Sequence, residues 1–398
     1  MRLEHLSASE FRNLERVEID FSPRFTILHG HNGAGKTNVL EALYLISTVR
    51  SFRSAELGPL VRHGQTQTRV EVTGRISGLG VTSTLCVTLE RGTRSTRRAA
   101  SADGKLVRSG AAFYGRLPAI LFTPEDLNVL RGSPGGRRRF LDRVLFARDR
   151  AHIGDIQTYE KLLRSRNHVL RGADQARGTR DRDAMLEAYE LRLSETGARI
   201  WTRRDQLVEE LRGAVTEGFA QIHGKAPQAD ITYSSHVQGF LREQGRTEDA
   251  ERATADVSAR AQVLHRALQD RRGLDLMRGT TSLGPHRDDF EMTLNGQSAA
   301  KYASQGQSRA LVLAFKIAEL QTSRAALGRA PVLLLDDVSS ELDPTRTGQL
   351  FQALAREVEQ CVLTTTSPRF IPLPDELERS YLAVAGGVIT TSGATLSG

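Results

Sequence analysis

The sequence predicts an α/β fold in which the first and last parts of the chain meet around an inserted helical lobe. Three observations support this prediction. A glycine-punctuated turn, residues 30–35, joins a strand-like segment to a helix-like one. Residues 137–272 are rich in Arg, Glu, Leu, Ala and Gln at helical spacing. Strand patterns then return and include the fully apolar segment 331–335, which is typical of a buried strand.

The N-terminal elements are predicted to be strands around one helix. Three short segments between residues 2 and 29 show the apolar alternation of strands, and the glycine turn follows them. Apolar residues then recur at helical spacing over 39–46. From 70 to 89 the alternation returns and is broken by glycine-rich turns, so we expect an antiparallel patch there.

The rest of the chain alternates between helical and strand patterns. The helical stretch 137–272 shows no heptads sustained over three or four repeats, which argues against a long coiled coil. Residues 290–294 alternate as a strand, and Asn295-Gly296 predicts a type I′ hairpin turn. We expect further helices at 309–320 and 347–358.

Length and composition exclude several classes of protein. The chain has 398 residues, of which 39% are hydrophobic and 26% charged, so both a disordered chain and a membrane protein are disfavoured. Its longest apolar stretches are far shorter than the roughly 20 residues of a membrane-spanning helix. Cys86 and Cys361 are too few for a disulfide framework and lack metal-ligand spacing. A reducing cytoplasm fits this cysteine usage.

The net charge of +8 favours an anionic partner without identifying it. Two basic runs, 91–108 and 131–150, contain much of the Arg, and the second holds seven arginines against two aspartates. Such a run often forms a solvated surface face, so its role depends on where the fold places it.

The glycine turn matches the pattern G-x-x-x-x-G-K-[ST] of a phosphate-binding loop, which must stand between a strand and a helix. Glycines let successive backbone N–H groups point at phosphate oxygens, and the helix N-terminus adds its dipole. Lys36 would reach the β- and γ-phosphates, and the Thr37 hydroxyl would ligate Mg²⁺. The residues of this loop are Gly30, His31, Asn32, Gly33, Ala34, Gly35, Lys36 and Thr37.

The apolar strand 331–335 ends in two acids, which is the form of a Walker B segment. Asp336 would hold Mg²⁺ through water, and Asp337 would orient or deprotonate the attacking water. A strand that ends in two aspartates could also simply be turning. The phosphate-binding loop earlier in the chain favours the hydrolytic interpretation.

A third element indicates the class of ATPase. Residues 303–307, Ala-Ser-Gln-Gly-Gln, resemble the LSGGQ signature of ABC-type ATPases, and 340–343 resemble their D-loop. Alone, this short motif would be interpreted as a polar helix cap. In that superfamily the signature serine and glycine, Ser304 and Gly306 here, contact the γ-phosphate bound to the opposite subunit. The resemblance therefore implies a nucleotide site shared by two chains.

Four segments resemble the RecF family of bacterial recombination mediators, which are related to the heads of SMC proteins. The likeness covers about residues 1–367. It is most specific at 124–142, 284–289, 302–307 and 335–343.

This resemblance implies an ABC-type ATPase head with slow, DNA-stimulated hydrolysis of ATP. It also implies an ATP-dependent homodimer on double-stranded DNA, near gaps or single/double-strand junctions. RecR and RecO would be partners in loading RecA during DNA replication, recombination, repair and the SOS response. Arg12-Asn13 resembles a nucleotide-contacting segment of SMC-type heads, with a surface turn as the alternative. Asn38, Ser304, Gly306 and Gln307 complete the candidate nucleotide contacts.

The chain departs from ABC transporters at several positions. Asp337 stands where they use the longer Glu, which predicts slow hydrolysis. Residues 364–366 are three threonines where a switch histidine is expected, and one hydroxyl could sense the γ-phosphate instead. Glu125 is the candidate for the Gln-loop position. His286 is as well explained by structural hydrogen bonds as by catalysis.

These observations divide the chain into four predicted ranges. Residues 1–120 and 276–370 would form the two parts of the ATPase lobe, and 121–275 the mainly helical inserted lobe. Residues 371–398 would be a C-terminal segment whose tail frays.

Two alternative functions share some of these features. The ATP-binding subunit of a transporter has the same three motifs, but the basic helical insert and the missing histidine argue against it. An SMC-like structural protein would need a long heptad arm and a hinge, which the sequence does not show.

Overall fold

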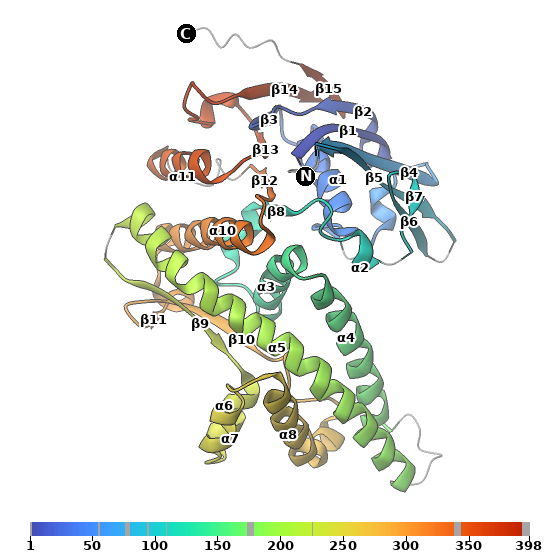
Figure 1. Ribbon diagram of the computed structural model, residues 1–398, viewed down its shortest axis with the longest axis vertical. Coiled ribbons are helices and arrows are strands. Elements are labelled where there is room, and N and C mark those ends of the chain that lie inside the picture. Colours follow the sequence, from blue (N-terminus) through green and yellow to red (C-terminus); the bar gives the residue numbers. More distant parts are fainter. Residues whose placement is uncertain are drawn as a thin grey trace.

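The computed structural model describes most of the chain and places its sheets and its helical lobe at opposite ends (Figure 1). The described residues are 2–54, 56–75, 80–93, 95–108, 110–172, 179–224, 226–337 and 344–391. The predicted D-loop, 340–343, and the end of the tail that we expect to fray, 392–398, lie outside them. In the described part, no helix combines the length and apolar composition needed to span a membrane.

A mostly parallel sheet joins segments from both ends of the chain. Its strand order is β15 (Val388–Thr391), β14 (Arg379–Ala385), β3 (Phe25–His29), β13 (Cys361–Thr365), β12 (Val332–Asp336) and β8 (Ala119–Phe122). The five strands from β14 to β8 are parallel, and β15 is antiparallel at the edge. The prediction that the first and last parts of the chain meet is confirmed.

Helices cover both faces of this sheet, which explains why its inner strands β3, β13 and β12, and the strand β8, are almost wholly buried. Leu333 and Leu335 pack in one core with α10 (Gln305–Leu327) and α11 (Pro344–Glu357). Val332 and Leu334 point the other way and pack in a second core with α1 (Lys36–Thr48). The predicted helices around 39–46, 309–320 and 347–358 are therefore confirmed.

The second core also contains the predicted antiparallel patch, which is part of a larger sheet. Its order is β2 (Leu14–Asp20), β1 (Arg2–Phe11), β4 (Gln67–Arg75), β5 (Thr82–Arg91), β6 (Thr96–Ala102) and β7 (Lys105–Leu106). Alternate residues of these strands, such as Val70, Val72, Leu85 and Val87, are buried against α1. The other face of each strand carries polar side chains.

The helical lobe is formed mainly by six helices of the described residues. They are α3 (Pro134–Arg148), α4 (Arg150–Leu170), α5 (Thr179–His223), α6 (His236–Glu243), α7 (Thr247–Arg252) and α8 (Val257–Arg278). Elsewhere the described chain has short helical elements: η1 (Gly58–Leu60), α2 (Gly110–Phe113), η2 (Pro124–Asn128), α9 (Ala299–Tyr302) and η4 (Pro368–Phe370). In Figure 1, α6, α7 and α8 lie at the end of the molecule farthest from the C-terminus.

The sequence patterns predicted one strand of a small third sheet, at 290–294, and missed the strand at 229–234 that pairs with it. β9 (Ala229–Ser234) pairs with β10 (Asp289–Leu294), which continues into β11 (Gln297–Ser298). β9 buries only two residues, Ala229 and Ile231, so it has little alternation to detect. The predicted hairpin turn is confirmed, because Asn295 and Gly296 have φ of +50° and +75°. A strand within 121–275 thus pairs with one beyond residue 276.

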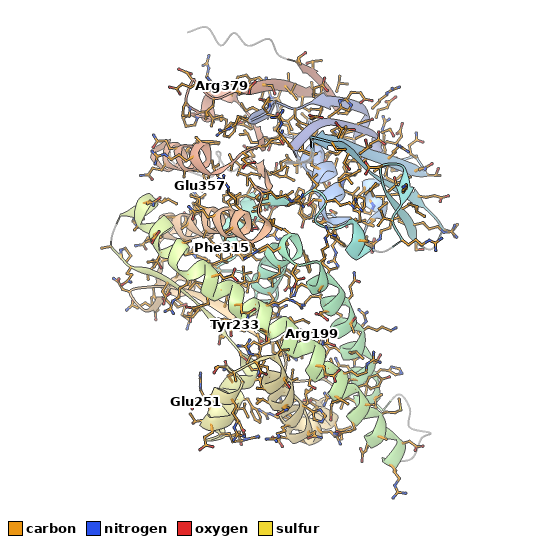
Figure 2. The ribbon with its side chains drawn as sticks, in the orientation of Figure 1. Arg199, Tyr233, Glu251, Phe315, Glu357 and Arg379 are labelled. Atoms are coloured by element: carbon orange, nitrogen blue, oxygen red, sulfur yellow. The ribbon has the colours of Figure 1, made fainter. Side chains whose placement is uncertain are left out.

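Aromatic packing joins the helical lobe to the parallel sheet. Phe140 of α3, Phe290 of β10 and Phe315 of α10 are fully buried, and the Phe140 and Phe315 ring centroids are 4.7 Å apart. Figure 2 shows Phe315 at the level where α10 meets α5. Such pairs stabilise a core beyond the area that they bury.

A buried ion pair joins three helices within the lobe, α3, α4 and α5. Asp142 of α3 accepts hydrogen bonds from Arg204 of α5 at 2.9 and 2.8 Å and lies 2.9 Å from His152 Nε2. Arg204 also donates to the Pro285 carbonyl at 2.7 Å. Burial alone would raise the pKa of Asp142, but Arg204 and His152 outweigh it and lower that pKa to about 2.

We expect Asp142→Asn to lower the free energy of unfolding by about 3 kcal/mol, because it leaves Arg204 buried without its counter-charge. The Asp142 pKa falls from 3.8 to about 2 on folding, so ionised Asp142 stabilises the protein above pH 3.8. That contribution, about 2 kcal/mol, is lost as pH falls towards 2. Denaturant unfolding at pH 7 and at pH 2–4 measures both effects.

Asp230→Asn is the control, because it breaks a pair with the exposed Arg212 that water already screens. We expect this substitution to lower the free energy of unfolding much less than Asp142→Asn does. Equal losses in the two variants, or the same acid dependence in Asp142→Asn and the unaltered protein, would contradict the role of the buried pair.

Candidate nucleotide site

The predicted phosphate-binding loop lies between β3 and α1 with its glycines in conformations that other residues avoid. Gly30, Gly33 and Gly35 have φ of +149°, +79° and +115°. α1 starts at Lys36 with no side-chain cap. By contrast, α3, α4, α6, α8 and α10 each begin with a Ser or Asp that accepts a backbone N–H. The first turn of α1 is therefore suited to binding an anion.

Two turns from distant parts of the chain pack against this loop. A Cβ on Gly30 would lie 2.2 Å from the Val384 carbonyl oxygen of β14, so no other residue fits there. The Gly387 N–H, in the turn between β14 and β15, donates to the Ala34 carbonyl at 2.8 Å. Asn13, in the turn between β1 and β2, donates to the same carbonyl at 3.3 Å.

The Lys36 side chain folds back onto the loop. Its Nζ donates to the carbonyls of Gly30 at 2.6 Å and His31 at 3.1 Å, and the residue is buried. Burial lowers the pKa of Lys36, while the negative charges of Asp337 and Asp336 act in the opposite direction. The ammonium therefore lies between the loop and the two acids, where a phosphate chain would supply the missing negative charge.

The structure brings Thr37 and Asp336 into contact, although they are 299 residues apart in the sequence. The Thr37 hydroxyl donates to Asp336 Oδ1 at 2.9 Å. This direction leaves the lone pairs of the hydroxyl oxygen available for a cation. Burial raises the pKa of Asp336, and hydrogen bonds from Thr364 and Thr37 partly counter this effect. One hydroxyl and one carboxylate at this edge form a donor set that fits Mg²⁺.

Asp337 follows directly at the end of β12 and is half-buried. It has φ of +38°, a left-handed conformation that is uncommon for a residue with a side chain. Its backbone N–H donates to the Thr364 hydroxyl at 2.9 Å. The two acids predicted from sequence thus leave the same strand end in different directions.

The signature segment begins α10. Ser304 is exposed at the N-cap, its hydroxyl accepts from the Gln307 N–H at 3.1 Å, and Gln307 Oε1 accepts from the Ser304 N–H at 2.9 Å. This capping box fixes the serine and the partly buried Gly306 at the helix start. Arg131 donates to the Ala303 carbonyl at 2.8 Å and so ties the segment to the region before α3.

Arg12 lies beside α1, but its guanidinium is committed to another residue. It makes a bidentate pair with the fully buried Glu41, at 2.7 and 2.8 Å, and donates to the Pro59 carbonyl. Asn13 and not Arg12 reaches the loop. Contact between Arg12 and a nucleotide therefore stays a prediction.

The sequence patterns missed a polar network that continues from Asn13. Asn38 donates to Asn13 Oδ1 at 2.7 Å and accepts from Arg53 at 2.9 Å. Ser51 donates to Glu41 Oε1 at 2.5 Å. The one signal for this network in the sequence was an acid, Glu41, in the helix that follows Lys36.

The structure also locates three further candidates. Glu125 is the second residue of η2, shortly after β8, and its charge acts on Asp336, so its position suits the Gln-loop prediction. Thr364 is buried and its hydroxyl binds the Asp336 carboxylate and the Asp337 backbone N–H, which disfavours a role as a free γ-phosphate sensor. Thr365 is also buried and its hydroxyl donates to the Ser367 carbonyl, so the same argument applies to it. His286 lies 2.8 Å from the Tyr159 hydroxyl and 3.1 Å from the Thr281 carbonyl. Burial lowers the pKa of His286 to about 4, and these bonds support the structural interpretation.

The second basic run is not a free surface face. Five of its seven arginines bind acceptors within the chain. They are Arg131 with Ala303, Arg137 with Asp289, Arg138 with Asp288, Arg143 with Asp126 and Arg148 with Glu210. In the first run Arg97, Lys105 and Arg108 are exposed. The sequence run alone overstated how much charge is available to a partner.

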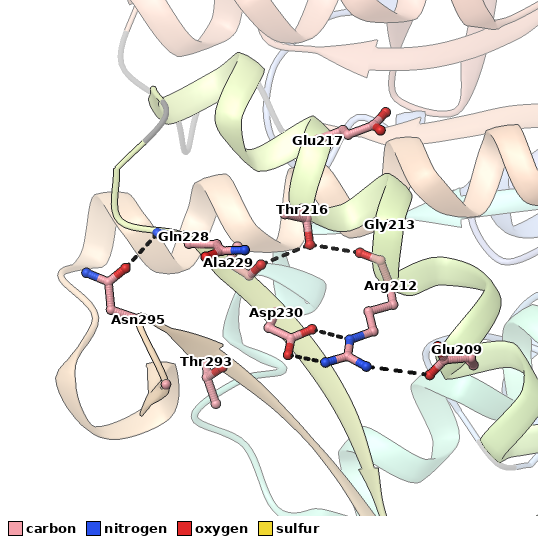
Figure 3. Close-up of a pocket in the computed structure, with 11 residues that line it drawn as sticks. Glu209, Arg212, Gly213, Thr216, Glu217, Gln228, Ala229, Asp230, Thr293 and Asn295 are labelled. Carbon is pink, nitrogen blue, oxygen red and sulfur yellow. Dashed lines mark hydrogen bonds and ion pairs between the residues drawn. The ribbon is translucent and has the colours of Figure 1, made fainter.

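Among the hollows outside the phosphate-binding loop, two are the largest of those described. One, of about 550 Å³, is lined by α5, β9 and the turn after β10, where Arg212 binds Asp230 at 2.6 and 2.7 Å (Figure 3). The other, of about 770 Å³, adjoins the nucleotide site and is lined by residues that include Arg53, Glu125 and Arg143. The first holds polar groups that already bind one another, so the chemistry lies with the loop and the acids.

We expect Gly387→Ala to weaken ATP binding about tenfold, which corresponds to about 1.4 kcal/mol. The added Cβ would lie 2.4 Å from the Asn13 carbonyl oxygen and would displace both turns that hold the loop. Gly386→Ala is the matched control, since it has a similar positive φ but open space around its Cβ. Titration with a fluorescent ATP analogue compares them. Equal affinities would show that the turn does not support the loop.

Comparison with known proteins agrees with this geometry. The family model described as RecF/RecN/SMC N terminal domain matches residues 2–384. A DNA replication and repair protein RecF from Anaeromyxobacter sp. (strain Fw109-5) is 44% identical over 98% of this chain and 99% of its own length.

Solved structures are similar over the whole chain as well. The recombination mediator protein RecF of the RecFOR pathway, as RecF-ATPrS, has a TM-score of 0.84 and 27% identity, covering 98% of this chain and 97% of its own. RecF-ATP from that pathway gives 0.81 and 26%, with coverage of 98% and 99%. The predicted ABC-type ATPase head with its inserted helical lobe is confirmed, and the chain belongs to the RecF family of the RecF/RecN/SMC group.

Proposed function

We propose that this protein is an ATP-hydrolysing recombination mediator of DNA replication and repair whose nucleotide site is completed by a second copy of the chain. The observation that carries the proposal is the 2.9 Å hydrogen bond between Thr37 and Asp336, which assembles the phosphate-binding loop and the acids. Ser304 supports the shared site, since it is exposed at the start of a different helix. Relatives named for DNA replication and repair, and RecF solved as RecF-ATP, support the wider role.

In this proposal each residue of the site has one task. Backbone N–H groups of 30–37 and the Lys36 ammonium bind the phosphates of ATP. Thr37 and Asp336 hold Mg²⁺, which when bound neutralises charge on the β- and γ-phosphates. Asp337 orients the water that attacks the γ-phosphorus, releasing ADP and phosphate. Its side chain is one methylene shorter than Glu, so we propose that turnover is slow. Membership of the RecF family leads us to propose that DNA stimulates it.

The proposed partners follow from the family. We infer that the ATP-bound dimer binds double-stranded DNA near gaps or junctions and, with RecR and RecO, helps to load RecA in the cytoplasm. The solved relatives are RecF proteins of the RecFOR pathway, which supports these partners. Family membership removes the transporter alternative. An SMC-like arm is disfavoured because the 45-residue α5 packs along α4, α8 and α10.

Mixing two variants that are defective in different halves of the composite site tests whether two chains share it. We expect Ser304→Arg to bind ATP as a monomer and fail to dimerise, because a bulky cation replaces the hydroxyl that meets the partner's γ-phosphate. Lys36→Ala should lose ATP binding itself. A mixture of the two variants contains heterodimers with one intact composite site, so some hydrolysis should return. Sedimentation with ATP and a turnover assay measure both properties.

A Ser304→Arg protein that dimerises and hydrolyses ATP normally would contradict the shared site. The matched control is Tyr302→Arg, which adds the same cation two residues earlier at another exposed position. It should interfere less, since it leaves the capping box and the serine in place.

DNA binding should depend on salt and on the exposed basic residues of β6 and β7. If the dimer neutralises about six phosphates, log K should fall with log salt at a slope near −5. Replacing Arg97, Lys105 and Arg108 by Ala should flatten that slope by about two to three for each contacting chain. Arg192→Ala with Arg266→Ala removes exposed charge from the helical lobe and should change it less. A salt-independent affinity, or no duplex binding with ATP, would contradict the DNA proposal.

A further inference from the structure

Thr364 lies where the acids of β12 meet the neighbouring strand. It is the residue of β13 paired with Asp336 in the parallel register, and only 2% of it is exposed. A hydroxyl buried to this degree must find its hydrogen-bond partners within the protein. Its rotamer is also restricted, because Thr is branched at Cβ.

This single hydroxyl binds both acidic positions. Thr364 Oγ1 donates its proton to Asp336 Oδ1 at 2.8 Å and accepts the Asp337 backbone N–H at 2.9 Å. A hydroxyl can do both at once, since it has one proton and two lone pairs. Asp336 Oδ1 also accepts from Thr37, so a continuous chain of hydrogen bonds runs from Asp337 to the phosphate-binding loop.

The conformation of Asp337 needs this support. Its φ of +38° is left-handed, which costs free energy for a residue with a side chain, although Asp tolerates it better than most. The backbone conformation sets the direction in which Cβ and the carboxylate leave the strand. The bond to Thr364 holds the amide of this residue, and therefore its side-chain direction, against relaxation.

We propose that Thr364 is a positioning residue for ATP hydrolysis, which fixes the direction of Asp337 and orients Asp336 for Mg²⁺. The proposal rests on the proposed function, because it takes Asp337 as the acid that orients water. Thr364 acts through these two residues and does not touch the substrate. Its hydroxyl is bound to both acids, so it serves them and not a γ-phosphate.

The chain contains a matched control on the same strand. Thr365 is fully buried, and its hydroxyl donates to the Ser367 carbonyl at 3.0 Å and lies 3.3 Å from the Ser367 N–H. Thr365→Val removes a buried hydroxyl of the same kind, one that binds the loop after β13. Any general effect of placing Val at a buried Thr should therefore appear in both variants.

The test compares Thr364→Val, Thr364→Ser, Thr365→Val and Asp337→Asn in the full chain. We expect Thr364→Val to lower kcat at least about tenfold while KM for ATP changes less than about threefold, since misdirection affects the transition state more than binding. Thr364→Ser keeps the hydroxyl and should recover kcat to within about threefold. Thr365→Val should match the unaltered protein.

Two readouts do not depend on turnover. The Mg²⁺ concentration that gives half-maximal binding of a fluorescent ATP analogue should rise in Thr364→Val and not in Thr365→Val. The temperature of thermal unfolding without nucleotide should fall by similar amounts in Thr364→Val and Thr365→Val. If Thr364→Val does not fold, Thr364→Cys replaces it, because a thiol is a weak donor of similar size.

Each outcome decides between the two proposals. Thr364→Val with the kcat and Mg²⁺ dependence of Thr365→Val, or no recovery in Thr364→Ser, overturns the positioning role. If Asp337→Asn is inactive in that case, the proposed ATP hydrolysis stands. Asp337→Asn turning over at the unaltered rate overturns the assignment of Asp337 itself, and with it this inference.

Discussion

The nucleotide site depends on the parallel sheet, whose strands β3, β12 and β13 all end at the same edge. Hydrogen bonding in register places His29 opposite Thr365 and Thr364 opposite Asp336. Loop residues that follow one strand then meet acids that end another, so Thr37 contacts Asp336 across 299 residues of sequence. No local propensity could hold these groups together, and the register of the sheet does so without a separate contact for each pair.

Burial then sets the charge state that the site prefers. It lowers the pKa of Lys36 and raises that of Asp336, so burial disfavours the ionised form of each group relative to water. A phosphate beside the lysine and a cation beside the acid would each favour that ionised form. The two ligands therefore reinforce each other electrostatically, because both reverse the same desolvation penalty.

Sequence patterns predicted those parts of the fold that leave a local signal. The glycines of 30–35 need positive φ, and the strand 331–335 is buried on both faces, so each carries its explanation in its composition. β9 was missed because only Ala229 and Ile231 are buried along it. Asn13 and Gly387 support the site through contacts between distant turns. Resemblance singled out Asn13, but no local pattern in the sequence indicates that Gly387 meets the loop.

The net charge of +8 illustrates the same limit for function. Arg137, Arg143 and Arg204 pair with acids of the chain itself, so their charges hold α3 and α5 to neighbouring elements. Lys316 of α10 belongs to this set, because it binds Glu319 at 2.9 Å and donates to the Leu121 carbonyl of β8. α10 thus carries the exposed Ser304 at its start and buried charges near its middle. Ser304 and these buried charges lie on the same helix. A shift of α10 that moves Ser304 towards a partner must therefore also move the contacts that Lys316 makes near the middle of the helix.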